Sequence, residues 1–260
     1  MADFAPGDVN NNPNLLTLAD DPNYCAIGLK VSEGTTYATT GGGWLNKLWP
    51  QAKDAWRGCA YGKTKFRLGY HYLIVASPGQ DGRAYGRKQY DWYQSVIDQV
   101  GGWAPGDMWA TWDLENGDQP ATMSNQAIID TASGFSERAL EVTGRMVMRY
   151  SGSLVRDRGI VNKMGASILW CAEYGAPGKP AQLDPAVYLK QGYTLADTLW
   201  WQYKGDTDPG LAPAGYPNQA PCGPGGSMAA ADLSAGIING GSDRNATISW
   251  IQTHLHATTI

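Results

Sequence analysis

The stretch Trp109-Ala-Thr-Trp-Asp113-Leu-Glu115-Asn-Gly117 is an apolar run that ends in two acids and a turn. Side chains alternate between the faces of a strand, so Asp113 and Glu115 are expected on one side and Trp112 and Leu114 on the other. Neighbouring carboxyls disfavour each other's ionised form, which lets one of them keep a proton near neutral pH. Such a pair is typical of general acid catalysis in glycoside hydrolases. Two solvated acids before a turn would give the same short pattern.

The composition indicates one globular domain spanning residues 1–260. The 260 residues are 43% hydrophobic and 17% charged, which suffices for a sizeable core. A net charge of -4 argues against nucleic acid as a partner. No run of 18 apolar residues exists, so membrane insertion is not expected. Residues 1–8 lack the basic and apolar regions of a signal peptide. We therefore expect a protein made in the cytoplasm that needs other means to reach any site outside it.

The four cysteines, Cys25, Cys59, Cys171 and Cys222, are widely spaced and include no C-x-x-C pair. This spacing does not favour a metal site. Cys25 and Cys171 lie in apolar, strand-like runs, where a free cysteine acts as a small buried hydrophobe. For these two we favour free thiols over a disulfide, and the disulfide state of all four cysteines stays open.

Strand and helix patterns alternate along most of the chain. Eight strands are expected, at residues 4–8, 26–33, 67–75, 108–114, 146–150, 167–172, 198–203 and 229–233. Helices are expected at 44–57, with Pro50 a bend or a break, and at 85–100, 124–142 and 245–256, with a short one near 186–190. This order predicts an α/β fold, a single-domain TIM-like (β/α) barrel of eight mostly parallel strands whose last helices are reduced to loops. A doubly wound open sheet is the alternative.

Acidic residues lie at the expected strand ends. Active sites of such barrels are built at the C-terminal ends of the strands. Five acids are placed there in this interpretation: Asp8, Glu33, Asp113, Glu115 and Asp232. We therefore expect them to converge on one mouth of the barrel.

Seven short motifs resemble, in order, those of the family 25 glycoside hydrolases, the lysozymes or muramidases common in phage lysins. They are Asp8-Val-Asn, Lys30-Val-Ser-Glu-Gly-Thr-Thr-Tyr37, Tyr70-His-Tyr72, Asp113-Leu-Glu115, Thr143-Gly-Arg145 with Tyr150-Ser151, Leu169-Trp170 with Ala172-Glu-Tyr-Gly175, and Trp201-Gln-Tyr203 with Ala231-Asp-Leu233. The resemblance runs from about residue 8 to 235. It departs from the family at Gly28, where a bulky apolar residue is expected, and after Asp8, where the spacing is one residue short. Asp3-Phe-Ala competes with Asp8 for the first position, and we expect Asp8.

The resemblance implies cleavage of the β-1,4 bond between N-acetylmuramic acid and N-acetylglucosamine in bacterial peptidoglycan, without cofactor or metal. It implies that Glu115 protonates the leaving oxygen and that Asp113 orients the acetamido group or stabilises the oxocarbenium charge, flanked by Asp8 and Asp232. Glu33 is either a further catalytic acid or a structural partner of Lys30.

Three aromatic residues, Tyr70, Tyr150 and Trp201, are candidates for sugar contact, with core packing as the alternative for each. His71 is expected to be a hydrogen-bonded barrel residue. As a phage lysin, the protein would be delivered to the wall by phage lysis machinery or as part of a virion. A non-catalytic wall-binding or virion structural module on the same fold is the rival function, and a chitin hydrolase is a weaker one. The oligomeric state stays open.

Overall fold

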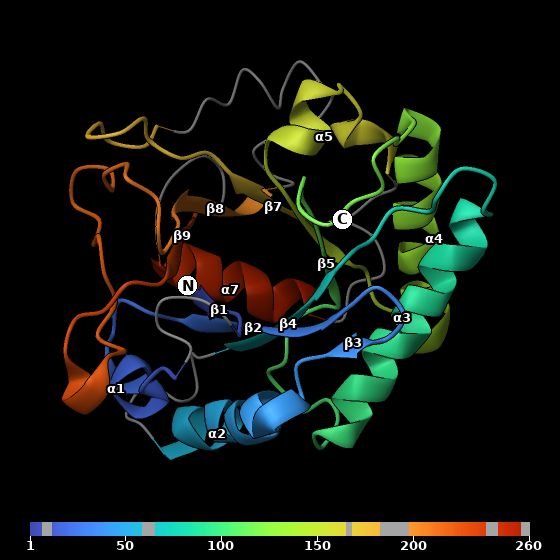
Figure 1. The fold of residues 1–260 in the computed structure, drawn as a ribbon. Coiled ribbons are helices and arrows are strands. Elements are labelled where there is room, and N and C mark those ends of the chain that lie inside the picture. The colour runs from blue at the N-terminus through green and yellow to red at the C-terminus, as the bar shows by residue number, and fades with distance from the viewer. Residues whose placement is uncertain (7–11, 59–65, 165–167, 183–197, 238–243, 256–260) are drawn as a thin grey trace.

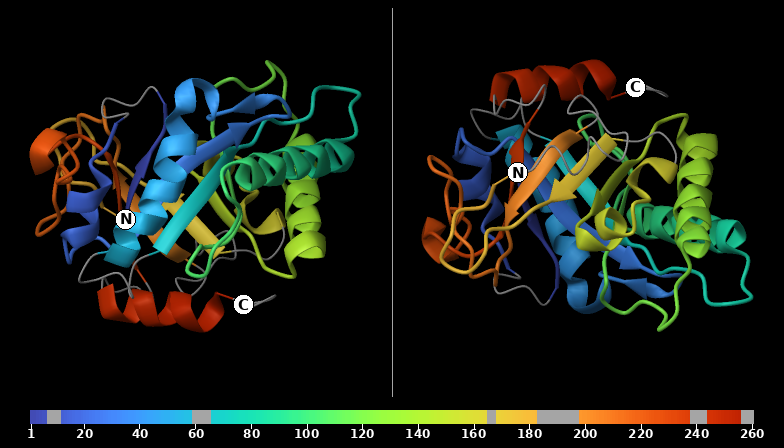
Figure 2. Two further views of the ribbon diagram at one scale, coloured as in Figure 1. Left: turned by 90° about the horizontal axis from the view of Figure 1, so that it is seen from below. Right: turned by 90° about the horizontal axis from the view of Figure 1, so that it is seen from above.

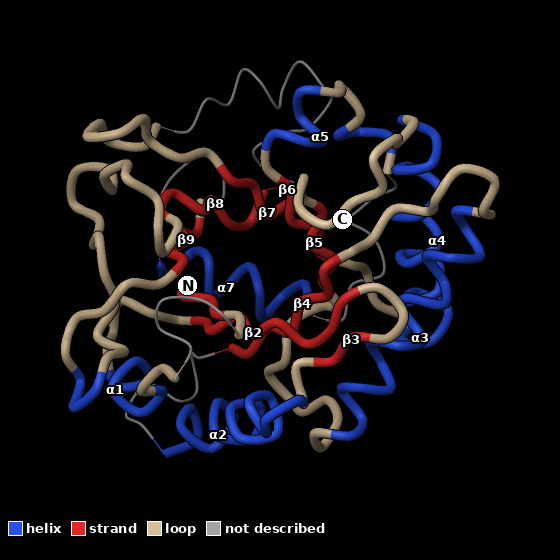
Figure 3. The backbone as a smooth tube through the Cα atoms, viewed as in Figure 1, coloured by secondary structure: helices blue, strands red, loops and turns tan. Residues whose placement is uncertain are grey.

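The structure is a computed structural model that describes residues 1–6, 12–58, 66–164, 168–182, 198–237 and 244–255. Its strands form one sheet that closes into a ring (Figure 3). The ring closes because β1 (Ala2–Phe4) pairs with both β2 (Ala26–Glu33) and β9 (Asp232–Gly236). A short strand, β3 (Tyr37–Ala38), is added antiparallel to β2 outside the ring.

Five further strands complete the ring: β4 (Phe66–Tyr72), β5 (Thr111–Leu114), β6 (Met148–Ser151), β7 (Ile168–Ala172) and β8 (Thr198–Lys204). Neighbours are parallel from β1 through β8, and β9 is antiparallel to both β8 and β1. The predicted barrel of eight mostly parallel strands is therefore confirmed, and the open sheet is not found.

Three long helices cover one side of the ring (Figure 1). They are α2 (Trp44–Gly58), α3 (Gly82–Gln99) and α4 (Asn125–Thr143). The Ser124 hydroxyl caps α4 by accepting from the Ala127 amide at 3.0 Å, and Gly144 ends it with φ 67°, as the sequence predicts. Pro50 lies inside α2 without dividing it.

The remaining helices among the described residues are shorter. They are α1 (Leu15–Asp20), α5 (Ser153–Asp157), α7 (Arg244–His254) and the 3-10 turns Gly41–Gly43, Val161–Lys163 and Pro224–Gly226. Loops follow β8 where a regular barrel would have a helix (Figure 1). The predicted loss of the late helices is thus confirmed in the described part of the chain. The short helix expected near residues 186–190 lies outside the described residues.

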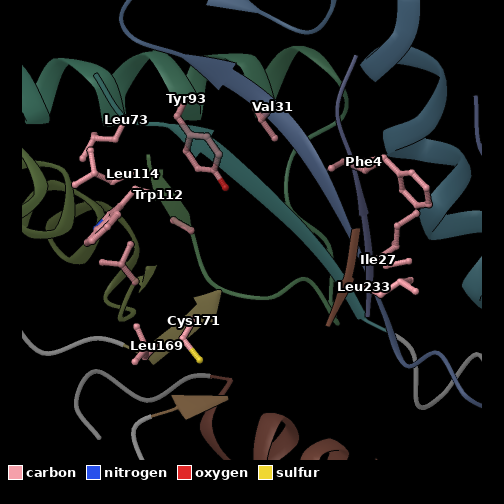
Figure 4. Close-up of a cluster of buried hydrophobic side chains, with 14 of the residues drawn as sticks. Phe4, Ile27, Val31, Leu73, Tyr93, Trp112, Leu114, Leu169, Cys171 and Leu233 are labelled. Atoms are coloured by element: carbon pink, nitrogen blue, oxygen red, sulfur yellow. The ribbon is translucent and has the colours of Figure 1, made fainter. Parts of the chain in front are cut away.

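Alternation along the strands separates two cores. The outer core lies between sheet and helices and contains Trp112 and Leu114, both fully buried (Figure 4). The inner core fills the barrel and includes Met148 and Trp200. Burial of one such large side chain stabilises the fold by about 1.5–3 kcal/mol, so a shift by one residue along a strand is strongly disfavoured.

Helix α7 closes one end of the barrel. It crosses behind the ring in the view of Figure 1 and lies at one edge of both views in Figure 2, and its Ile248 and Ile251 join the inner core with Met1, Cys25 and other residues at the strand starts. Helix α7 does not cover the other end of the barrel, where the parallel strands finish and where the candidate site lies. No helix in the described ranges has the length and apolar character that a membrane span requires.

The first and last strands differ from expectation. The first strand is Ala2–Phe4 rather than 4–8, because Ala2 and Phe4 are both fully buried and the alternation therefore begins earlier. Asp232 was expected at the C-terminal end of a strand, but it begins β9. It still reaches the same mouth because β9 runs opposite to its neighbours.

Candidate active site

An acid-lined cavity of about 160 Å³ lies at the end of the barrel opposite α7. It is lined by Asp3, Ala5, Lys30, Tyr70, Tyr72, Asp113, Glu115, Tyr150, Trp170, Gln202 and Asp232. The predicted convergence is therefore found for Asp113, Glu115 and Asp232, and for the aromatic residues Tyr70 and Tyr150.

Strand β5 positions the two central acids. Asp113 and Glu115 both line the cavity, whereas Trp112 and Leu114 pack in the outer core, as alternation predicts. Asp113 is only 7% exposed. Glu115 is half-buried and also lines an adjoining cavity of about 270 Å³ with Asn116 and Gly152. Glu115 is thus the acid of the pair that faces both cavities.

The two carboxyls hold protons more tightly than free acids do. Burial, followed by the negative charge of Glu115, raises the pKa of Asp113 well above its usual range. Burial also raises the pKa of Glu115, although a hydrogen bond with Tyr150 and the positive charge of Lys30 act in the opposite direction. Atom Oδ1 of Asp113 is buried without a hydrogen-bond partner among the described residues. A carboxyl in such surroundings favours its neutral form.

The acid that β1 brings to the site is Asp3. It is 3% exposed, lines the cavity and is paired in register with Asp232 across β1 and β9. Gly28 lies opposite Asp3 on β2, and a Cβ on Gly28 would lie 2.6 Å from the Asp3 Cβ. The missing side chain at position 28 therefore leaves room for Asp3. Asp8, the residue that we expected here, lies outside the described residues.

Asp232 is held by a neighbouring loop. Its Oδ1 accepts a hydrogen bond of 2.7 Å from the Asp206 amide. The negative charge of Asp232 contributes to the raised pKa of Asp113. The loop after β8 therefore fixes one of the charges that act on the central pair.

Lys30 is the one lysine or arginine side chain among the described residues that line this cavity. Its ammonium lies 2.9 Å from Glu33 Oε2 and 4.7 Å from the centre of the Tyr72 ring. Glu33 itself is not among the lining residues. Of the two roles that the sequence left open for Glu33, the geometry favours the structural partner of Lys30.

Two tyrosines and a glutamine form one wall of the site. The hydroxyls of Tyr150 and Tyr174 lie 2.9 Å apart, and both donate to Oε1 of Gln202, Tyr174 at 2.6 Å. The Tyr150 ring also packs edge-on against Trp170, with 4.6 Å between ring centres. Sequence reasoning missed Gln202 and Trp170, although both lie in quoted motifs and both share the inward face of their strands.

Backbone contacts hold the loop that follows Glu115. The Tyr72 hydroxyl donates to the Gly117 carbonyl at 2.5 Å. The Gln119 side chain accepts from the Val75 amide at 2.9 Å and donates to the Leu73 carbonyl at 2.9 Å. These three bonds tie the segment after β5 to the end of β4, so Glu115 projects from an anchored backbone.

Trp201 does not join the site, which corrects one sequence prediction. It is 6% exposed in the outer core, and its indole N–H donates to the Glu173 carbonyl at 3.0 Å. Its neighbour Gln202 takes the inward position because consecutive strand residues face opposite sides. Of the two alternatives for Trp201, core packing is the one observed.

His71 is a buried structural residue, as the sequence predicts. Its Nδ1 lies 2.9 Å from the Ser32 hydroxyl and its Nε2 lies 3.1 Å from Gln89 Oε1. Burial lowers its pKa to about 3, so the ring is neutral at physiological pH. This neutral ring links β2 and β4 to α3 beneath the site.

The described residues contain no group of three or more His, Cys, Asp or Glu side chains arranged to hold a metal ion. Cys25, Cys171 and Cys222 are buried, and none of the three takes part in a disulfide in the described part of the chain. Cys59 lies outside the described residues. Cys25 and Cys171 are therefore buried residues, as their apolar surroundings in the sequence predict.

Solved structures of lysozymes and endolysins have the same fold. The lysozyme from Streptomyces coelicolor matches with a TM-score of 0.59 at 18% identity, over 99% of this chain and 97% of that one. A family 25 glycosyl hydrolase from Bacillus anthracis gives 0.58 at 15% identity, over 92% and 88%. The catalytic domain of endolysin ply40 from bacteriophage P40 of Listeria monocytogenes gives 0.56 at 16% identity, over 95% of each chain. The sequence itself matches no protein-family model and no curated protein. The chain therefore has the barrel fold of these three solved structures.

Proposed function

We propose that this protein is a family 25 glycoside hydrolase that cleaves the β-1,4 bond between N-acetylmuramic acid and N-acetylglucosamine in bacterial peptidoglycan. The observation that carries the proposal is the pair Asp113 and Glu115, two acids of raised pKa that share one cavity at the mouth of the barrel. The fold shared with a bacterial lysozyme and a phage endolysin supports peptidoglycan as the substrate class.

Glu115 acts as the general acid in this proposal. It is the half-buried member of the pair and faces both cavities, so a glycosidic oxygen bound between them lies within its reach. Its raised pKa keeps a proton available at higher pH than an ordinary glutamate would. Asp113, deeper in the barrel, orients the acetamido group of the substrate or balances the positive charge that develops on the sugar ring.

Asp3 and Asp232 complete the acid cluster as we propose it. Both line the cavity, from β1 and β9 respectively. Their carboxylates add negative potential, which favours both a protonated acid and an oxocarbenium-like transition state. Asp8 stays a candidate that only direct substitution tests.

Aromatic rings supply the surfaces for sugar binding. Tyr70, Tyr150 and Trp170 line the cavity beside the acids. Rings that combine an apolar face with a polar edge suit a saccharide, whose own surface alternates C–H and O–H groups.

The protein reaches the wall, in our proposal, through phage lysis machinery or as part of a virion. The endolysin CTP1L and the endolysin ply40 both share the fold, which supports a phage setting. Release of intact virions that carry the protein would distinguish a virion component from a free endolysin.

The deciding experiment measures turbidity of isolated bacterial walls and identifies the new reducing end. We expect lysis with N-acetylmuramic acid at that end. Glu115→Gln should slow lysis by roughly a hundredfold or more, because the amide keeps the shape of the acid but cannot donate its proton. Glu141→Gln, the same change at an exposed glutamate on α4, should leave the rate unchanged.

Three outcomes would contradict the proposal or one of its parts. Wall binding without lysis by the parent protein would indicate the non-catalytic module, and N-acetylglucosamine at the new end would indicate a different hydrolase. Parent-level lysis by folded Glu115→Gln, checked by circular dichroism, would remove Glu115 from its role.

A further inference from the structure

Three side-chain oxygens meet at the wall of the acid-lined cavity. They are the hydroxyl of Tyr150 on β6, the hydroxyl of Tyr174 after β7 and Oε1 of Gln202 on β8. The two hydroxyls lie 2.9 Å apart, and the Tyr174 hydroxyl lies 2.6 Å from Gln202 Oε1. Tyr150 donates to the same amide oxygen. Since an amide oxygen has two lone pairs, Gln202 can accept the protons of both phenols.

The position of Gln202 is fixed by its strand. It is 2% exposed and lies in register with Ala172 on β7 and with Ser234 on β9. Its side chain faces the cavity, whereas its neighbour Trp201 lies in the outer core. A strand that is hydrogen-bonded on both sides holds a side chain more precisely than a loop does. Oε1 of Gln202 is therefore held beside the two phenols.

The Tyr150 hydroxyl has one proton and two acceptors within reach. One is Gln202 Oε1, and the other is the carboxyl of Glu115, with which Tyr150 also forms a hydrogen bond. When the phenol proton goes to Gln202, Tyr150 can bond to Glu115 only as an acceptor, so the proton of that bond must come from Glu115. When the phenol proton goes to Glu115, the bond stabilises the ionised carboxylate instead.

We propose that Gln202 is a positioning residue for the general acid: it takes the Tyr150 proton and so leaves the Tyr150 oxygen to accept from protonated Glu115. This rests on the proposed function, in which Glu115 gives its proton to the leaving oxygen. After that transfer the Tyr150 hydroxyl turns to donate to the new Glu115 carboxylate, while Tyr174 keeps its bond to Gln202. The same phenol thus bonds to Glu115 before and after the transfer, and only the direction of the bond changes.

Other titratable groups surround Glu115 and stay unchanged when Gln202 is replaced by another uncharged residue. Those that line the same cavity are Asp3, Lys30, Tyr70, Tyr72, Asp113, Tyr150 and Asp232, and next to them lie Tyr174 and Glu33. The adjoining cavity adds no further charged side chain among its described lining residues. A change in the titration of Glu115 on such a replacement therefore reports the hydrogen bonds and not an altered charge.

The test follows the Glu115 carboxyl carbon by NMR titration, in protein labelled at its glutamates and with the signal assigned by Glu115→Gln. Gln202→Met keeps the length of the side chain and removes the acceptor oxygen. The Tyr150 proton should then turn to Glu115, weaken the proton affinity of that acid roughly tenfold and lower its titration midpoint by about one pH unit. The alkaline limb of wall lysis should move down with it. Gln202→Glu keeps an acceptor oxygen and should leave the midpoint at or above the parent value.

Gln94→Met is the matched control. Gln94 on α3 also accepts with Oε1 from a tyrosine, the Tyr90 hydroxyl at 3.2 Å, and from the Trp103 indole N–H at 2.9 Å. The same change there should leave the Glu115 midpoint unchanged, because this glutamine is not among the residues that line the acid-lined cavity. Circular dichroism checks the folding of each variant.

A second control asks whether Gln202 acts through the phenol. In a Tyr150→Phe background, Gln202→Met should not move the Glu115 midpoint further, since the proton that it releases is absent. A shift that persists in that background would overturn the proposal.

An unchanged or raised midpoint in folded Gln202→Met would also overturn it, because the amide nitrogen would then face the phenols. So would a lowered midpoint in Gln202→Glu. The NMR titration needs no turnover, so this inference and the proposed function can fail separately. Wall lysis by the parent protein without the shift in Gln202→Met would leave the function and remove this role of Gln202. The shift in a protein whose parent lyses no walls would leave the hydrogen-bond arrangement and remove the function.

Discussion

Two buried groups of charged residues lie at opposite ends of the neighbouring strands β4 and β5. They differ in whether positive and negative charges balance each other. At the strand starts, Arg67 binds Asp107 through two contacts, of 2.7 Å and 2.5 Å. The guanidinium lies 3.6 Å from the centre of the Trp49 ring, and the Ala104 amide donates to Asp107 at 2.6 Å. Each charge in this group has an opposite charge and further hydrogen bonds.

At the strand ends, Asp113 and Glu115 share a cavity with two further acids and with Lys30, which is itself paired to Glu33. Negative charge is in excess there, and the pKa values of both central acids are raised. The comparison teaches that a buried charge is tolerated in the barrel when it is matched and supplies proton chemistry when it is not. Four predictions test this contrast.

Removal of the matched acid should have the largest effect. Asp107→Asn leaves the Arg67 charge buried without its partner and should destabilise the protein by about 3–5 kcal/mol. Urea unfolding at neutral pH measures the change. Asp91→Asn, which removes the acid of an exposed pair with Arg138, is the control and should cost about 1 kcal/mol or less. Equal losses in the two variants would mean that burial of the pair does not matter.

The acid on β1 should affect activity rather than stability. Asp3→Asn should reduce wall lysis by roughly tenfold or more, since it removes charge beside the general acid. Gly28→Ala should act in the same direction, because the new Cβ would displace the Asp3 side chain. Asp8→Asn in the same assay decides between the two candidates. Full activity of Asp3→Asn with loss in Asp8→Asn would support the prediction made from sequence, that Asp8 is the acid of the first strand.

Neutralising the central unmatched acid should stabilise the fold. The pKa of Asp113 is raised in the folded state, so its contribution to stability is present at low pH and is lost as pH rises through that value. The Asp113→Asn variant should therefore have a melting temperature a few degrees above that of the parent protein at pH 7. This difference in melting temperature should shrink toward pH 4. Calorimetry at the two pH values measures both quantities. A gain that is larger at pH 4 would contradict the assigned direction of the shift.

Substitution of Lys30 should have the smallest effect, a shift in the pH dependence of kcat/KM. Its positive charge lowers the pKa of both Asp113 and Glu115. Lys30→Met should therefore raise those pKa values and move the alkaline limb of kcat/KM to higher pH. Glu33→Gln keeps the lysine and should move the limb less. A shift to lower pH would show that Lys30 acts through substrate binding or packing instead.

The regular half of the barrel was predictable from local patterns. Residues 26–33 and 125–143 are a strand and a helix nearly as expected, because burial alternates along the one and Ser124 and Gly144 bound the other. That Asp113 and Glu115 point to the same side of their strand followed from the two-residue alternation of side chains alone. Asp232 was also located, although the direction of its strand was wrong.

The irregular half was not predictable in the same way. Three residues of β1 are too few for a periodic pattern, so the motif spacing favoured Asp8 while burial of Ala2 and Phe4 places Asp3 in the cavity. Trp201 was chosen over Gln202 because it is aromatic, whereas the strand register decides which of the two faces inward. These positions depend on which face of each strand points into the closed barrel, and no local sequence pattern contains that information.

The sequence by itself determined the acid pair of β5, the alternation of strands and helices and the outward position of Trp112, because each follows from the geometry of one element. Only the tertiary structure decided that Asp3 lines the cavity with the pair, that Gly28 makes room for it, and that Lys30 and Glu33 form an ion pair beside it. Those facts depend on strands that are distant in sequence and become neighbours only when β1 pairs with β2 and β9.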